Sequence, residues 1–163
     1  AYIYCEGPGS VLGLRLCAMA IETWKRIHAT PSALYAYNSL HLVAADLIER
    51  GMIGGDTLVI SDWKKDTWNG LKICDRKPES VAPVTSTELT AWRGALYHLP
   101  ARKGWQKPPE KATAVGYHPE CLPKLTNLAD LIEARSEVEL YNSGLNTFQK
   151  WTPQRHGADA SPA

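Results

Sequence analysis

The stretch YCEGPGSVLGLRLCAMAIETWKRI, residues 4–27, decides the fold of this chain. Residues 1–5, AYIYC, overlap the start of this stretch. They are apolar and aromatic, which is typical of a β-strand. Residues 6–9 form a predicted tight turn, because glycine and proline favour chain reversals. Ser10 then predicts a helix N-cap. Apolar side chains recur at spacings of three and four through residues 11–28, so we expect a long helix there.

The predicted helix carries more apolar side chains than one buried face requires. The row that we expect to face the core consists of Val11, Leu14, Ala18, Ile21 and Trp24. The residues that widen this apolar surface are Leu12, Leu16, Met19 and Ile27. Leu12 and Leu16, or Cys17 and Met19, are therefore candidates for a surface that a partner helix covers. For Trp24 and Met19, burial in the protein's own core is the default interpretation, and a partner surface is the alternative.

Further along the chain, predicted strands alternate with predicted helices, which indicates an α/β layered fold. We expect a strand at residues 33–37 and a helix at 39–50 that Ser39 caps. Residues 57–60 and 68–74 predict two antiparallel strands joined by a polar turn. The weaker predictions are a helix at 85–99, a strand at 113–117, a helix at 125–134 and an extended segment at 138–141.

Composition narrows the classes of function. The chain has 163 residues, 44% hydrophobic and 21% charged, which is normal for a folded domain. Its net charge of +1 gives no general attraction for a polyanion. We find no apolar run long enough to cross a bilayer and no secretion signal, so we expect a cytoplasmic protein without membrane partners.

Neither cysteines nor acid–base groups form a recognisable catalytic motif. We expect the four cysteines, Cys5, Cys17, Cys74 and Cys121, to be buried free thiols, with a catalytic cysteine as the alternative. Asp62 and Asp66 flank a turn that contains lysines, so we interpret them as solvated turn residues rather than a carboxylate pair. No local metal-ligand or nucleophile motif is present in the sequence. A catalytic site assembled from residues distant in sequence would leave no such motif. We therefore predict no catalytic residues, no metal and no cofactor.

Two further features have a binding interpretation and a simpler one. The turn before the first helix offers free N–H groups that hold an anion in other proteins, but it equally serves close packing of strand and helix. A basic and aromatic stretch either follows a nucleic-acid backbone or forms a solvated loop. Its residues are Arg93, Arg102, Lys103, Trp105, Lys107 and Lys111. A second small cluster consists of Lys150, Trp151, Arg155 and His156.

Residues 5–16, CEGPGSVLGLRL, closely resemble the G-P-G-S-[FY]-T-G-[LV]-R motif of the TsaB family, proteins of tRNA threonylcarbamoyladenosine synthesis that are also described as glycoprotease-like. Four later segments stand where the family has its helix start, its strand before D-A-R, its G-E-V-Y strand and its closing segment. These segments are residues 38–40, 57–62, 66–73 and 139–151. The resemblance is specific over the first segment, fair to residue 73 and faint beyond it.

The resemblance implies an actin-like ATPase (RNase H-like) fold. Residues 1–55 would be the remainder of an N-terminal lobe, 56–151 a smaller second lobe, and 152–163 a disordered tail. It also implies a non-catalytic subunit that binds the catalytic subunit TsaD, with the ATPase TsaE, to modify adenosine 37 of tRNA. The partner interface would comprise Leu12, Leu16, Met19 and Thr23. The structural turn would comprise Gly7, Pro8, Gly9, Ser10, Gly13 and Arg15.

Three differences from the family pattern shape these expectations. The family's opening strands with their D-T-[AS] turn have no counterpart, so we expect an N-terminally truncated and divergent member. Val11 and Leu12 replace an aromatic residue and threonine, and residues 62–64 replace D-A-R. The alternatives are a repurposed interaction module of the same superfamily and, less favoured, an actin-fold enzyme. Contact with tRNA would be indirect, and a homodimer is a further expectation.

Overall fold

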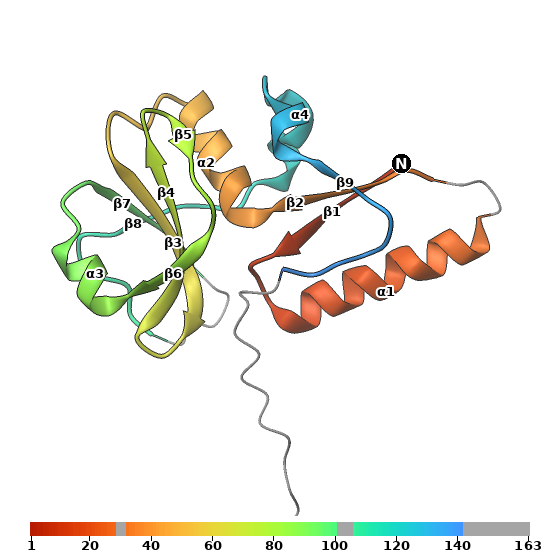
Figure 1. Cartoon of the computed structure of the whole chain (residues 1–163), viewed down its shortest axis with the longest axis horizontal. Coiled ribbons are helices and arrows are strands. Elements are labelled where there is room, and N and C mark those ends of the chain that lie inside the picture. Colours follow the sequence, from red (N-terminus) through yellow and green to blue (C-terminus); the bar gives the residue numbers. More distant parts are fainter. Residues whose placement is uncertain (29–31, 101–105, 142–163) are drawn as a thin grey trace, which may run out of the picture.

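The computed structural model describes residues 1–28, 32–100 and 106–141, and these form two β-sheets with helices on their faces (Figure 1). The α/β class predicted from the sequence is therefore confirmed. The elements, in chain order, are β1 (Tyr2–Gly7), α1 (Val11–Ile27), β2 (Leu34–Asn38), α2 (Ser39–Glu49), β3 (Thr57–Lys64), β4 (Thr67–Cys74), β5 (Lys77–Pro78), β6 (Ala82–Thr85), α3 (Ser86–Ala91), β7 (Ala95–Leu99), β8 (Thr113–Ala114), the 3-10 helix η1 (Pro119–Lys124), α4 (Leu128–Leu131) and β9 (Glu133–Arg135).

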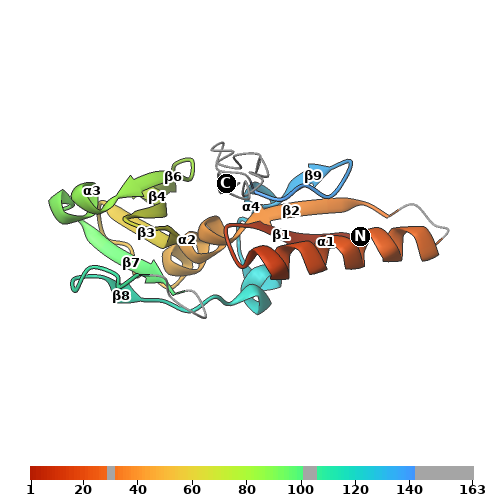
Figure 2. The same cartoon turned by 90° about the horizontal axis from the view of Figure 1, so that it is seen from below.

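The first sheet has three strands in the order β1-β2-β9. Strands β1 and β2 are parallel, with Tyr2 opposite Leu34, and α1 is the crossover between them. Strand β9 adds antiparallel to β2. The small core of this sheet combines Tyr4, Ile21, Leu34 and Ala36, so α1 contributes a single fully buried side chain to it. Figure 2 shows α1 running alongside β1 and β2, far from α3.

The second sheet has the strand order β5-β4-β3-β7-β8, and β6 also pairs with β4. The predicted hairpin is confirmed, because β3 and β4 are antiparallel with Val59 opposite Leu71. Helix α2 packs on one face of this sheet, where its residues Leu40, Val43 and Leu47 form a core with the strands. A second core lies on the other face, beneath α3, around Leu58, Ile60, Trp68, Val84, Leu89 and Leu96.

The boundary between the sheets falls in the chain between α2 and β3. Packing crosses that boundary in both directions, because α2 buries its apolar side against the second sheet and β9 returns to the first sheet. Residues 1–55 therefore do not complete the first sheet by themselves. The predicted tail, 152–163, lies outside the described residues.

Four predictions of secondary structure were wrong in part. The strand predicted at 113–117 is only the two-residue β8. The helix predicted at 85–99 ends at Ala91, and β7 follows. Gly94 separates them at a point where a side chain would collide with the Asp56 carbonyl, and the Ala95 N–H donates to that carbonyl at 3.0 Å. The helix predicted at 125–134 is only the short α4, because β2 offers a free edge that β9 occupies. Asn38, not Ser39, caps α2 through a 3.0 Å bond from the Leu40 N–H.

Candidate interaction surface on helix α1

The turn before α1 contains one position, Gly7, that only glycine suits. Gly7 has φ +124°, a conformation that L side chains rarely adopt, and a Cβ there would lie 3.1 Å from the Tyr141 Cβ. The same Cβ would lie 3.2 Å from Leu14 of α1, so the absence of a side chain lets the helix approach β1. The Pro8 carbonyl accepts a 2.6 Å hydrogen bond from the Ser39 hydroxyl, which ties the turn to the start of α2.

Both ends of α1 have favourable chemistry. Ser10 is the N-cap, as predicted, and its hydroxyl accepts from the Gly13 N–H at 3.4 Å. Lys25 and Arg26 occupy the last turn, where positive charge favours the helix dipole. Of the remaining turn residues, Gly9 and Arg15 are exposed. The turn therefore fixes where α1 begins and the direction in which it runs.

The inner face of α1 is narrow. Ile21 is buried, Leu14 and Ala18 are half-buried, and Trp24 stacks on Tyr2 with ring centroids 6.2 Å apart. The prediction that Val11 faces the core was wrong, because it is 64% exposed; Trp24 does face the sheet but remains 49% exposed. A 17-residue helix is about 25 Å long, whereas the six residues of β1 extend about 20 Å and the sheet has three strands. The sheet is thus too small to cover both ends of the helix.

The outer face of α1 is apolar and exposed. Leu12, Leu16 and Met19 are 67%, 56% and 66% exposed, and Thr23 is exposed as well. At 100° per residue these four side chains fall within a sector of about 60°, centred about 170° from the inner row. We call this row, Leu12, Leu16, Met19 and Thr23, the outer stripe; the exposed Ile27 extends it toward the helix end.

The outer stripe has few polar groups of its own. The Thr23 hydroxyl donates to the Met19 carbonyl at 2.7 Å, so its hydrogen-bonding capacity is largely used inside the helix. Charges lie beside the stripe, where Arg15, Glu22 and Arg26 follow one border, and Glu22 pairs with Lys25 at 3.7 Å. An exposed apolar row with charged borders is typical of a surface that another protein covers. The four residues predicted as an interface thus lie together on one side of one helix.

A polar pair that sequence reasoning missed lies inside the second sheet. Asp62 was interpreted as a solvated turn residue, and that was wrong: its side chain is 3% exposed and one carboxylate oxygen lies 3.3 Å from Nε2 of His98, which is 6% exposed. Asp66 does lie in the turn, at φ 57°. The pair forms because β3 and β7 align with Ile60 opposite His98 in the sheet. No local sequence motif predicts this alignment.

The prediction that the four thiols are buried was wrong, because none of them is fully buried. All four cysteines are free, but Cys17 is exposed on α1, and Cys5, Cys74 and Cys121 are half-buried. Burial raises the pKa of the Cys5 thiol, which therefore stays protonated at neutral pH. Burial likewise lowers the pKa of His41, whose ring Nε2 lies 3.1 Å from the Glu79 carbonyl oxygen.

The basic and aromatic residues predicted as one stretch are not all described. Lys111 donates to the Trp92 carbonyl at 2.6 Å, and Arg93 and Lys107 are exposed. Arg102, Lys103 and Trp105 lie outside the described residues, as do Lys150, Trp151, Arg155 and His156. The described part of this stretch therefore contains a structural lysine and two exposed cations rather than a continuous basic track.

Within the described ranges, no three acidic, histidine or cysteine side chains gather as a metal site. No helix in the part of the chain that the structure describes is long and apolar enough to cross a membrane. The chain matches no protein-family model, and no curated protein matches it.

Proposed function

We propose that this chain is a non-catalytic, TsaB-like subunit that binds a TsaD-like catalytic subunit in the threonylcarbamoyl modification of adenosine 37 in tRNA. The observation that carries this proposal is the outer stripe: an apolar row on the opposite side of α1 from the row that packs on the sheet. A helix that is apolar on two opposite sides uses one for its own core and offers the other to a partner.

The resemblance at residues 5–16 supplies the identity of the partner. The residues of the GPGS turn have the structural role that the proposal needs, because Gly7 brings α1 against β1 and Ser10 begins the helix. An actin-like arrangement of the two sheets is part of the same proposal, supported by the parallel β1-α1-β2 unit. A TsaE-like ATPase would join the complex, tRNA would contact it indirectly, and the complex would work in the cytoplasm.

Helix-on-helix docking suits the geometry of the stripe. Leu12, Leu16, Met19 and Thr23 are spaced four, three and four residues apart, which is the pattern that packs into the groove of a facing helix. Gly13, also exposed, adds a position without a side chain where a partner backbone can approach. The charged border of Arg15, Glu22 and Arg26 would set the orientation of the partner rather than its affinity.

The direct test is binding to the TsaD-like subunit of the same organism, measured by calorimetry and size-exclusion chromatography. Leu16→Glu and Met19→Glu each place a charge in the centre of the stripe, and we expect both to abolish binding. Thr87→Glu adds the same charge at an exposed position of α3 and should bind as the parent does. A parent chain that fails to bind, under conditions where a TsaB from another organism binds its own TsaD, would overturn the proposal.

The alternative is an interaction module that uses the same stripe for another partner. This alternative predicts that the parent chain does not bind the TsaD-like subunit but binds a different protein. Leu16→Glu should abolish that binding, and Thr87→Glu should retain it. A variant of the stripe that binds the TsaD-like subunit unchanged would show that the contact lies on another surface, and would exclude the outer stripe as the docking site.

A further inference from the structure

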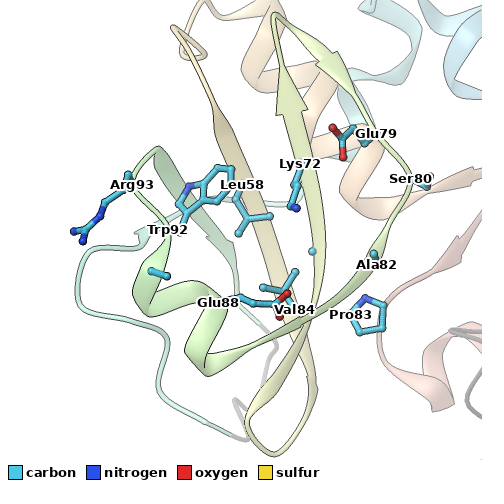
Figure 3. A pocket seen from close by; sticks show the side chains of 12 residues that line it. Leu58, Lys72, Glu79, Ser80, Ala82, Pro83, Val84, Glu88, Trp92 and Arg93 are labelled. Atoms are coloured by element: carbon cyan, nitrogen blue, oxygen red, sulfur yellow. The ribbon is translucent and has the colours of Figure 1, made fainter.

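A hollow of about 470 Å³ lies on the second sheet, on the face that α3 covers in part (Figure 3). Its lining mixes charges, because Glu79 and Glu88 stand against Lys72, so the hollow selects no class of ligand. The outer stripe of α1 differs, because the order of its side chains has a two-fold symmetry. Figure 1 shows α1 at the outer edge of the first sheet, where another helix can approach it.

The spacing of the outer stripe is the same in both directions along α1. Leu12, Leu16, Met19 and Thr23 are separated by four, three and four residues, so the centre of the stripe lies between residues 17 and 18. At about 1.5 Å per residue, Leu12 and Thr23 lie about 8 Å on either side of this centre, and Leu16 and Met19 lie about 2 Å on either side. A second α1 that runs antiparallel across the stripe therefore places its Thr23 opposite Leu12 and its Met19 opposite Leu16. Each contact then occurs twice about a two-fold axis.

The polar side chain of the stripe, Thr23, is compatible with such a contact. Its hydroxyl already donates to the Met19 carbonyl at 2.7 Å, so covering it leaves no donor without a partner. The three apolar side chains, Leu12, Leu16 and Met19, are all more than half exposed, and a second helix would remove them from water. The apolar part of the stripe therefore favours a cover of its own shape.

The charged border of the stripe follows the same symmetry. Arg15 lies about 4 Å before the centre and Glu22 about 7 Å after it, on the same flank of the helix. In an antiparallel pair the same flank of each helix meets, so Arg15 of each copy lies beside Glu22 of the other, with an offset of about 3 Å along the axis. Arg15 is exposed, and the Glu22 carboxylate lies 3.7 Å from Lys25, which is longer than a hydrogen bond. Both groups are therefore available for an ion pair between copies.

The charges also decide between alignments of the two helices. Sliding one helix by four residues places Leu16 opposite Thr23 and keeps the apolar rows in contact. The same slide brings Arg26 of the second copy as close to Arg15 as Glu22 is, which cancels the attraction. In the centred alignment Arg15 and Arg26 are about 9 Å apart along the axis, so the attraction to Glu22 prevails. The centred antiparallel alignment is therefore favoured.

We propose that two copies of this chain associate antiparallel through the outer stripe of α1, with Arg15 of each copy paired to Glu22 of the other. The inference rests on the surface that the proposed function uses, so a second copy and the TsaD-like subunit would exclude each other there. With one helix from each copy, the contact lies at the lower end of specific interface sizes, and we expect a dissociation constant of about 1–100 µM. Its test uses this chain alone, so a monomeric chain would overturn the dimer and leave the proposed function standing.

Sedimentation velocity of the full chain, at concentrations on both sides of the expected dissociation constant, measures the association. We expect a monomer–dimer equilibrium that Leu16→Glu abolishes and that Arg93→Glu, at an exposed position after α3, keeps. Arg15→Glu and Glu22→Arg should each raise the dissociation constant about tenfold, because each turns two ion pairs into like-charge contacts. The double variant with both changes should return it to within about threefold of the parent value.

The double variant is decisive because Arg15 and Glu22 are about 10 Å apart along one helix, so they cannot pair within a chain. The proposal is overturned by a chain that stays monomeric over the whole range, by a dimer that Leu16→Glu keeps, or by a double variant as weak as the single ones. Circular dichroism shows whether each variant is folded. If Leu16→Glu does not fold, the charge reversals and their rescue decide the question.

Discussion

Nε2 of His98 lies 3.3 Å from Oδ1 of Asp62, and both side chains are almost completely buried between β7 and β3. The second carboxylate oxygen of Asp62 has no hydrogen-bond partner within the described residues. A buried carboxylate with a single partner depends strongly on that partner, because nothing else near it compensates for lost hydration.

We expect His98→Leu to lower the free energy of unfolding by about 3 kcal/mol, since the variant leaves the Asp62 carboxylate buried and unpaired. Asp62→Asn keeps the shape and removes the charge, so its loss should be smaller, about 1 kcal/mol. Urea unfolding followed by circular dichroism measures both. Equal losses for the two variants would contradict a pair whose cost lies in the unpaired charge.

We expect Gly7→Ala to destabilise the protein by about 1–3 kcal/mol, because Gly7 has a positive φ and no room for a methyl group beside Tyr141 and Leu14. Gly9→Ala is the matched control: a Cβ at Gly9 would meet only the Leu14 side chain at 4.0 Å, so the change should be close to neutral. Thermal unfolding of the two variants compares them. A Gly9 variant as unstable as the Gly7 variant would show that the turn needs both glycines for another reason.

A charge introduced on the inner side of α1 should lower the free energy of unfolding much more than a charge on the outer side. Leu16→Glu adds a charge to an exposed side chain and should change the free energy of unfolding by no more than about 0.5 kcal/mol. Ile21→Glu places a charge in the core of the first sheet and should cost about 3 kcal/mol or more. Urea unfolding separates the two predictions. Strong destabilisation by Leu16→Glu would place that residue in the core and remove the outer stripe.

Stability should fall as the solution is acidified from about pH 7 to about pH 5, in part because of His41. Burial lowers the pKa of His41 in the folded state, so the unfolded chain takes up the proton first. The stability that neutral His41 contributes is therefore complete above its unfolded pKa and is lost as the pH falls through the folded one. His41→Gln should flatten this part of the curve. Urea titrations at several pH values give the slopes.

The sequence by itself determined the local structure around α1. Gly7, Pro8 and Ser10 specify the turn and the helix start through backbone conformation and one cap, which are short-range effects. The α/β class and the β3-β4 hairpin also followed from periodicity. Leu12, Leu16 and Met19 could be singled out from the spacing of apolar residues on a helix, whereas Thr23 entered only with the interface that the family resemblance implies.

Only the tertiary structure decided which side of α1 is covered, and how much of it. The sheet behind the helix is small, so Val11 and Trp24 remain exposed although their spacing fits a core row. Tertiary contacts also decided β7. The sequence there has a helical pattern, but it forms a strand because β3 provides a parallel edge and the Asp56 carbonyl accepts a hydrogen bond. The Asp62–His98 pair likewise exists only through strand register. Such contacts join residues distant in sequence, and their free energy depends on neighbours that no local pattern specifies.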